Sequence, residues 1–172
     1  MINAVQTVYY IDLSPRPWYT KSDVPEADSL VIQSLVDKGY QVIPFSETDN
    51  YLKVVLPREG IYSALDLDDI SKNVLVLEGK SSNFSSDAIA QIGRLENLLR
   101  LDLSSSSLDV SAMTELNNLP RLESINLFGT NAGDNVLDNL SSFPSLKRVY
   151  VWQSKVTAEG VRAFESKRSD VA

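Results

Sequence analysis

The feature that most constrains this chain is a pattern of apolar residues, L-x-x-L-x-L, that returns at a fixed spacing. Copies begin at Leu98, Leu122 and Leu146, each 24 residues after the one before, and valine replaces leucine at two places in the third copy. A repeat of this kind determines the architecture into which every other motif must fit, so it is considered before anything else.

Each unit combines a strand pattern with a helix pattern. In the first half, the L-x-L pair points two side chains to one face, because side chains alternate along a strand. The second half, as in residues 134–140, carries apolar residues at helical spacing and predicts a helix that faces the same core. One unit cannot bury its own core, so stacked units share one. The pattern is that of a leucine-rich repeat. We expect an α/β solenoid with parallel strands on its concave face and short helices on its convex face.

An earlier and weaker copy of the repeat precedes the three regular ones. Residues 73–77 are apolar at the matching places, and aligning Leu75 with Leu101 separates the two copies by 26 residues. This alignment predicts a two-residue insertion between Leu77 and Phe84. Four copies exceed the roughly three that a repeat array needs for stability.

The repeats divide the chain into three parts. About four repeats fill residues 73–165 and end with a short helix at residues 157–164. Residues 1–72 do not repeat, and residues 166–172 form a polar tail that is expected to fray. Because stacked repeats need polar-faced caps, the first part is interpreted as an N-terminal cap, with a separate functional domain as the alternative.

The N-terminal part is expected to contain a strand, a helix and a β-hairpin. Residues 8–11 have the pattern of a strand and lead into an extended Pro-rich connector at residues 14–18. Two further apolar segments, at residues 40–45 and 51–56, are separated by turn-forming residues and predict the hairpin.

The expected N-terminal helix has recognisable ends. Residues 22–27 carry the cap residue, the proline and the acids of a helix start, and Gly39 is placed to end the helix. Its buried face is expected to hold Leu30, Val31, Leu35 and Val36.

The composition excludes several kinds of active site. The chain has 172 residues, none of them His or Cys, so it lacks the groups for a catalytic triad, a Cys–His pair, the usual zinc site or an attached c-type haem. Its net charge of −7 argues against binding to nucleic acid. No apolar run approaches the ~20 residues of a membrane span. We therefore expect no catalysis, no cofactor, no metal and no membrane insertion.

Two polar clusters have structural explanations. The serine run at residues 104–107 could suggest a nucleophile, but no histidine can activate it, so it is interpreted as a turn after a strand. The acids Asp66, Asp68 and Asp69 could suggest a cation site, but they lack the glycine and terminal glutamate of an EF-hand. They are interpreted as acids at a helix N-terminus.

The strand residues that flank the buried pair are expected to point outward and to form columns across the concave face. The last strand is rich in aromatic residues beside an arginine, which is the composition of an interface hot spot. The candidate partner-binding residues are Arg100, Asp102, Asn126, Phe128, Arg148, Tyr150 and Trp152. The three expected columns are Val74, Arg100, Ser124 and Arg148; then Val76, Asp102, Asn126 and Tyr150; then Glu78, Ser104, Phe128 and Trp152.

Two parts of this candidate surface, the last strand and the residues around Arg100, also have a purely structural interpretation. The last strand is an edge that needs cover, so the C-terminal tail could pack on Tyr150 and Trp152. Arg100, beside Asp102 and Asn126, could belong to a solvated cross-strand network. The sequence leaves these alternatives open.

Two short sequence segments resemble those of one group of known repeat proteins. Residues 125–130 (INLFGT) and 149–157 (VYVWQSKVT) resemble the "LNLYGT" and "LYLWQTKVT" phrases in the C-terminal repeat region of bacterial, planctomycete-type c-type cytochrome domain proteins. The segment that starts at Gly39 is similar to the one preceding those repeats. The family's haem motif C-x-x-C-H is absent, and serine replaces its threonine at Ser106 and Ser154. The resemblance covers most of residues 22–165.

The resemblance implies a non-haem repeat portion of an exported, redox-associated protein at the periplasm or cell surface. The start of the chain lacks the regions of a signal peptide, so a cytoplasmic location is the alternative. We expect a non-catalytic interaction module whose concave face binds a protein, or else a glycan. The alternative function is a structural module that positions a haem domain lying outside this chain. The oligomeric state is left open.

Overall fold

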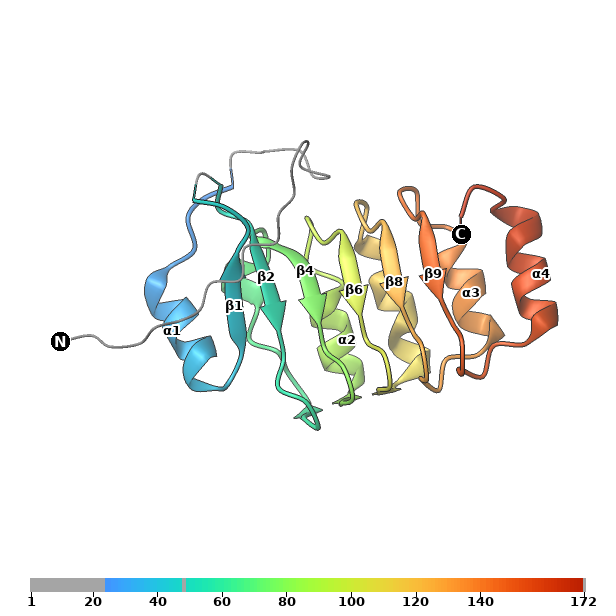
Figure 1. The fold of residues 1–172 in the computed structure, drawn as a ribbon, viewed down its shortest axis with the longest axis horizontal. Helices are drawn as coiled ribbons and strands as arrows, with labels where there is room; N and C mark the ends of the chain where they lie inside the picture. The colour runs from blue at the N-terminus through green and yellow to red at the C-terminus, as the bar shows by residue number, and fades with distance from the viewer. Residues whose placement is uncertain (1–23, 48, 172) are drawn as a thin grey trace.

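In the computed structural model, which describes residues 24–47 and 49–171, the chain is a mixed α/β protein built on an open six-stranded sheet (Figure 1). β1 (Gln41–Pro44) and β2 (Leu52–Val55) form the expected antiparallel hairpin. All later neighbours in this sheet are parallel, in chain order: β4 (Val74–Glu78), β6 (Arg100–Asp102), β8 (Ser124–Asn126) and β9 (Arg148–Tyr150). The described strands do not close into a barrel.

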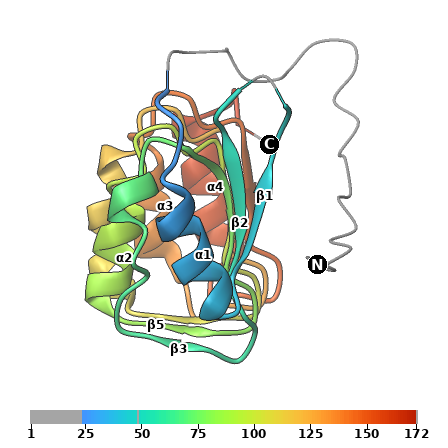
Figure 2. The same cartoon turned by 90° about the vertical axis from the view of Figure 1, so that its left-hand side faces the viewer.

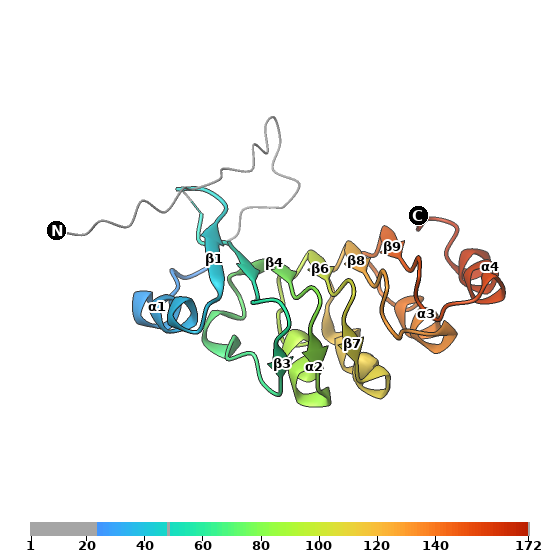
Figure 3. The same ribbon diagram turned by 60° about the horizontal axis from the view of Figure 1, so that its bottom comes forward.

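A second, smaller sheet and the helices complete each crossover. The second sheet is parallel and consists of β3 (Ile61–Tyr62), β5 (Asn83–Phe84) and β7 (Ser107–Leu108). The helical segments are α1 (Ser29–Asp37), η1 (Asp68–Ile70), α2 (Ser86–Ile92), η2 (Val110–Asn118), α3 (Asp134–Leu140) and α4 (Ala158–Lys167). The four α-helices lie on one side of the six-stranded sheet (Figures 2 and 3). The sheet face on the other side is called the open face below.

The strands repeat in a strict register. Leu77 pairs with Leu101, Leu101 with Ile125, and Ile125 with Val149, so each step along the sheet is 24 residues. The first copy therefore aligns through Leu77. The alignment through Leu75 was wrong, and no insertion is present before Phe84, which pairs in turn with Leu108.

The register of the first copy is hard to recognise in the sequence, because a glycine stands at one of its inward positions. Gly79 occupies the place of Leu103 in the next repeat, so the L-x-L pair is broken in the sequence. A Cβ on Gly79 would lie 2.5 Å from the Phe84 Cζ atom. The Phe84 ring therefore fills the volume that the missing side chain leaves, and the core stays packed.

The N-terminal helix starts later than predicted. Its N-cap is Asp28, whose carboxylate accepts a hydrogen bond from the Leu30 N–H at 2.8 Å, whereas the sequence pointed to residues 22–27. The chain around Val24 is not helical and is bonded to two later segments. The Asn50 side chain donates to the Val24 carbonyl, and the Asn73 side chain donates to the Pro25 carbonyl. Gly39 follows the helix with φ of 86°, as expected.

The buried face of α1 also differs in part from the prediction. Leu35 is fully buried and Val31 packs against the core. Leu30 is 77% exposed and Val36 is 37% exposed, so the predicted face was wrong at both positions. Ile32 packs against the core in their place. One continuous cluster of buried side chains connects Leu35 with the far end of the molecule.

The C-terminal end is more ordered than the sequence suggested. α4 continues to Lys167, through residues that were expected to fray. The Arg168 guanidinium then donates to the carbonyl oxygens of Ser141, Phe143 and Leu146 at 2.8–3.2 Å, and Val171 packs against the core. The tail therefore closes the helical side of the last repeat. The strand and the connector expected at residues 8–11 and 14–18 lie outside the described residues.

Candidate binding face

Outward-pointing side chains on the open face form three rows that cross the parallel strands. The register corrects the predicted columns by two residues in the first repeat: Val76, not Val74, stands beside Arg100, and Glu78 stands beside Asp102. Val74 is instead buried in the core. The upper row is Lys53, Val76, Arg100, Ser124 and Arg148, and the middle row is Val55, Glu78, Asp102, Asn126 and Tyr150.

The third row follows the ends of the strands. Ser81, Ser105 and Gly129 donate backbone hydrogen bonds to the carbonyls of Ser104, Phe128 and Trp152, so each bonds to the residue that precedes its own counterpart in the next repeat. These bonds continue the register and place Lys80, Ser104, Phe128 and Trp152 in line.

A groove of about 200 Å³ runs across the open face. It brings together four of the seven predicted residues, Arg100, Asp102, Asn126 and Tyr150. Phe128, Arg148 and Trp152 do not line it. The other lining residues are Phe45, Lys53, Val76, Glu78, Leu101 and Ser124. The sequence placed Glu78 in the wrong column, beside Ser104, because it misaligned the first repeat. It missed Lys53 and Phe45 because both belong to the hairpin, and only the pairing of β2 with β4 brings that hairpin beside the first repeat.

Alternating charges stabilise one half of the groove. Lys53 Nζ lies 2.6 Å from a Glu78 oxygen, and Lys80 Nζ lies 3.3 Å from both Glu78 and Asp102. Burial by itself would raise the pKa of Glu78, but the hydrogen bond and charge of Lys53, followed by those of Lys80, outweigh it and lower that pKa. This half of the groove is therefore internally neutralised.

Asp102 and Asn126 hold the turns that follow their strands. The Asp102 side chain accepts the Ser104 N–H at 3.0 Å, and the Asn126 side chain accepts the Phe128 N–H at the same distance. Side-chain oxygens that accept the N–H two residues ahead form Asx turns. These two predicted residues therefore have structural roles as well as places in the groove.

Two arginines stand close together in the upper row of the open face, one of them in the groove and the other outside it. Arg100 and Arg148 flank Ser124 in the upper row. The pKa of Arg100 is lowered, first by burial and then by the nearby Arg148, although Glu123 opposes this effect. Glu123 is itself 2.7 Å from Lys147. Among the described residues, Arg148 forms no ion pair.

The aromatic residues of the last strand stay exposed. Tyr150 is 50% exposed and Trp152 is 73% exposed. Val171 packs against the core cluster, beside a small cavity lined by Val149 and Phe164. The described part of the tail therefore does not cover Tyr150 or Trp152, and the capping interpretation was wrong for both.

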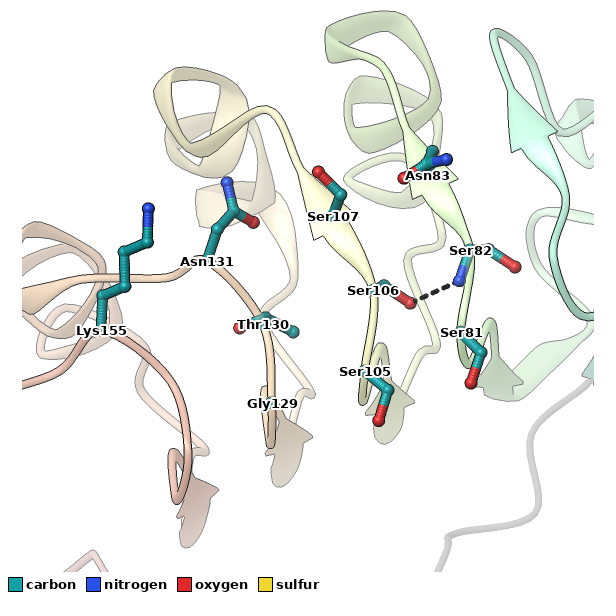
Figure 4. A pocket seen from close by; sticks show the side chains of 10 residues that line it. All are labelled: Ser81, Ser82, Asn83, Ser105, Ser106, Ser107, Gly129, Thr130, Asn131 and Lys155. Atoms are coloured by element: carbon teal, nitrogen blue, oxygen red, sulfur yellow. Dashed lines mark hydrogen bonds between the residues drawn. The ribbon is translucent and has the colours of Figure 1, made fainter.

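A second hollow, of about 420 Å³, is an open polar trough where the strands turn toward the helices (Figure 4). Its lining is Ser81, Ser82, Asn83, Ser105, Ser106, Ser107, Gly129, Thr130, Asn131 and Lys155. One residue of each turn has a left-handed backbone, and these residues recur every 24 positions: Ser81, Ser105, Gly129 and Gln153.

The floor of the trough is a chain of internal hydrogen bonds. The buried Ser106 hydroxyl accepts the Ser82 N–H at 3.1 Å and donates to the Gly79 carbonyl at 2.9 Å (Figure 4 shows the first bond). Thr130 donates to the Leu127 carbonyl at 2.8 Å. The serine run at residues 104–107 thus includes a turn, as predicted, and its buried hydroxyl is structural.

Of the three acids in the predicted cluster, Asp68 and Asp69 lie in the first turn of η1, as expected, and two of the three form ion pairs. Asp66 pairs with Lys38 at 2.8 Å, and Asp68 pairs with Arg94 at 3.4 Å. Within residues 24–47 and 49–171, no group of three or more acidic side chains is placed to hold a metal ion. No helix in the same ranges is long and apolar enough to cross a membrane.

Comparison with known proteins adds no identification. The sequence matches no family model and no curated protein. The functional argument therefore depends on the groove, the charges and the exposed aromatic side chains described above.

Proposed function

We propose that this chain is a leucine-rich-repeat protein that binds a protein partner through its open face. The repeat assignment is supported by the 24-residue register of four parallel strands. It is also supported by turn residues that recur at the same spacing, including the left-handed residues Ser81, Ser105 and Gly129. Stacked units of this kind present an extended sheet surface that suits protein recognition.

The observation that carries the binding proposal is the exposure of two large aromatic side chains on a sheet face that the α-helices leave uncovered. Tyr150 and Trp152 are among the few large apolar side chains exposed within the described residues. Aromatic residues next to an arginine are enriched at the energetic centre of protein interfaces. Two large aromatic side chains exposed on the same sheet face therefore support an interaction site there.

The chemistry of the face favours binding over catalysis. The carboxylates in the groove, Glu78 and Asp102, are paired with lysines at 2.6–3.3 Å. Despite burial, the pKa of Glu78 is lowered by the hydrogen bond and charge of Lys53, and that of Asp102 by hydrogen bonds from Ser104 and then by Lys80. A general acid needs a pKa raised toward neutrality, so neither group suits that role. The absence of histidine from the sequence removes the most common general base.

The proposal is tested by comparing the proteins retained from the source cells by four forms of the chain. Wild type and Leu30→Ala should retain the same partner, because Leu30 is exposed on α1, which lies on the helical side of the sheet. Tyr150→Ala and Trp152→Ala should retain much less of it. If all four forms retain every protein equally, the open face is not the binding surface.

The resemblance to cytochrome-associated repeats gives a second candidate, a module that positions a haem domain outside this chain. The phrase at residues 125–130 ends in Gly129, with φ of 65°, and in Thr130, whose hydroxyl is bonded within the turn. These features explain part of the phrase by turn geometry alone, so they favour the repeat assignment more than the redox association. The intact mass and haem absorption of the native gene product test this candidate. A larger mass with a haem band would support it, and a mass matching this chain without one would exclude it.

A further inference from the structure

The last strand of the six-stranded sheet has no strand on its outer side among the described residues. β9 ends the strand order, after β8 (Figure 1). The Arg148 N–H donates to the carbonyl of the residue before β8, and the Tyr150 carbonyl accepts the N–H of the residue after β8. Because successive residues of a strand direct their backbone groups to opposite edges, those of Val149 and Val151 point away from β8.

Earlier repeats use the same outward groups to bind the next strand. The carbonyls of Leu99 and Glu123 each accept two N–H groups from the start of the strand that follows. Lys147 is their counterpart in the last repeat, and its carbonyl accepts none within the described part of the chain. The outer edge of β9 therefore offers the carbonyls of Lys147 and Val149 and the N–H groups of Val149 and Val151.

The apolar side chains of the last repeat are also less covered than those before them. Four inward positions of the third repeat are buried, and they are held by Ile125, Leu127, Ala132 and Leu137. The matching positions 24 residues later are only half-buried, and they are held by Val149, Val151, Val156 and Val161. Val171 of the tail covers part of this end, but its N–H donates to the Arg168 carbonyl and not to β9. Stacked repeats need cover at their ends, so the described chain leaves this end partly uncovered.

A second copy of the chain matches this edge when the two β9 strands run antiparallel about a two-fold axis at Val149. The N–H and carbonyl of Val149 then bond to those of Val149 in the other copy, and the Val151 N–H meets the Lys147 carbonyl of the other copy. The remaining two groups at that position are already used within each copy, because the Lys147 N–H donates to Glu123 and the Val151 carbonyl accepts the Ser154 N–H. The edge is therefore complementary to itself.

The side chains also suit this pairing. Arg148 lies opposite Tyr150 of the other copy, with the two Cα atoms about 4.5 Å apart. An arginine beside an aromatic ring is a favourable contact, and no like charges lie directly opposite each other at this pair. On the inward side, the half-buried Val149 of one copy lies beside that of the other.

We propose that two copies of this chain associate through the outer edges of their β9 strands. Directly opposite residues point to the same face, so the two open faces form one continuous surface with Tyr150 and Trp152 of both copies near its centre. A two-fold contact of this kind uses the same patch on both subunits and closes at the dimer. The inference goes beyond the proposed function, because it concerns a second copy at the edge of the sheet and not a partner on its face.

Sedimentation of the full chain over a range of concentrations tests the association, and a species of twice the mass of one chain is expected. Val149→Pro removes the outward N–H of Val149 but no bond to β8, so it should weaken association by about tenfold or more. Val149→Ala is the matched control, because it also loses the valine side chain but keeps the N–H, and it should associate more tightly than Val149→Pro. Circular dichroism confirms that each variant is folded.

Cysteine cross-linking tests the register without any proline substitution, because the chain has no cysteine of its own. A mixture of Arg148→Cys and Tyr150→Cys chains should form a mixed disulfide under mild oxidation, since opposite Cα atoms about 4.5 Å apart lie within disulfide range. The control mixture is Arg148→Cys with Asn126→Cys. Asn126 pairs with Tyr150 one strand in from the edge, so this mixture should form no disulfide.

The inference is overturned if the wild-type chain sediments as a monomer at every concentration. It is also overturned if a dimer forms but cross-links equally well in both mixtures, because the contact then lies elsewhere. Neither result bears on the proposed function, which is decided separately by whether a protein from the source cells is retained by the wild-type chain and lost with Trp152→Ala.

Discussion

The ring of Phe84 occupies the space that a side chain on Gly79 would need, since a Cβ built there would lie 2.5 Å from the Phe84 Cζ atom. In the third repeat the large and the small residue stand at the opposite positions. There Leu127 takes the place of Gly79, and the small Ala132 takes the place of Phe84, both fully buried. In both repeats a large side chain at one position is matched by a small one at the other, because a densely packed core limits the total volume of the two side chains.

Gly79→Leu should destabilise the fold by about 1–3 kcal/mol, because overpacking forces the Phe84 ring out of its place. Phe84→Ala should also destabilise it, by about 3–5 kcal/mol, because it leaves a cavity. The double variant reproduces the Leu127–Ala132 arrangement and should be more stable than the sum of the two losses predicts. Urea unfolding of the four proteins measures this coupling, and additive losses would show that the two sites do not share volume.

Ser106→Ala should cost about 1–3 kcal/mol. The substitution removes the acceptor of the Ser82 N–H and the donor to the Gly79 carbonyl, and it leaves buried polar groups without partners. Ser107→Ala is the matched control, because Ser107 is the next residue along the chain and is exposed. This substitution should change the free energy of unfolding by less than about 0.5 kcal/mol. Thermal unfolding compares the two, and equal shifts would contradict a structural role for the Ser106 hydroxyl.

Arg168→Met should loosen the C-terminal end of the molecule. The guanidinium donates to three backbone carbonyls around the end of α3, and the loss of such bonds to a charged donor is expected to cost about 2 kcal/mol. Lys167→Met serves as the control, since its ion pair with Asp138 is exposed and such pairs contribute about 0–1 kcal/mol. Hydrogen exchange in α4 should accelerate in the first variant only.

Alkaline pH should destabilise the fold through Tyr40. Burial, with smaller contributions from Tyr62 and Asp66, raises the pKa of Tyr40 from 10.0 to about 12, and its hydroxyl donates to the Leu65 carbonyl at 3.3 Å. Because the folded pKa lies above the unfolded one, the stabilisation is complete below pH 10 and is lost as pH rises toward 12, by about 1.4 kcal/mol per pH unit for this group. Tyr40→Phe should flatten that part of the stability profile. An unchanged slope would contradict the assignment.

Several elements could be predicted because local pattern and tertiary structure agree. The strands β6, β8 and β9 and the helix α3 lie where the repeat places them, and Val136, Leu137 and Leu140 are buried as the helical spacing requires. The hairpin of β1 and β2 also forms where alternating apolar residues flank a turn. In each case the residues that form the element are the ones that bury its apolar face.

The errors arose where distant contacts override local signals. Val24 packs with Tyr51 and Leu75 in a small separate cluster, so the chain before Asp28 cannot continue into a helix. Leu30 is helical but faces away from the core. Neither outcome follows from helical propensity or spacing, because both depend on which neighbour the segment contacts.

Some residues of the candidate site could be predicted from the sequence, and others could be placed only with the structure. The sequence identified Arg100, Asp102, Asn126 and Tyr150 as outward-facing residues near one another, and the groove contains all four. It placed Glu78 in the wrong column, because the first repeat aligns correctly only once Gly79 is matched with Leu103. It did not identify Lys53, because only the pairing of β2 with β4 brings that residue to the face.

The sequence by itself therefore determined the period of the repeat, the alternation of strand and helix, and the absence of histidine and cysteine chemistry. Those properties depend on residue type and spacing along the chain. Only the tertiary structure decided the register of the first repeat, the pairing of Glu78 with two lysines and the exposure of Trp152. These depend on how volumes and charges from separate repeats fit together across the sheet, and no local pattern encodes that fit.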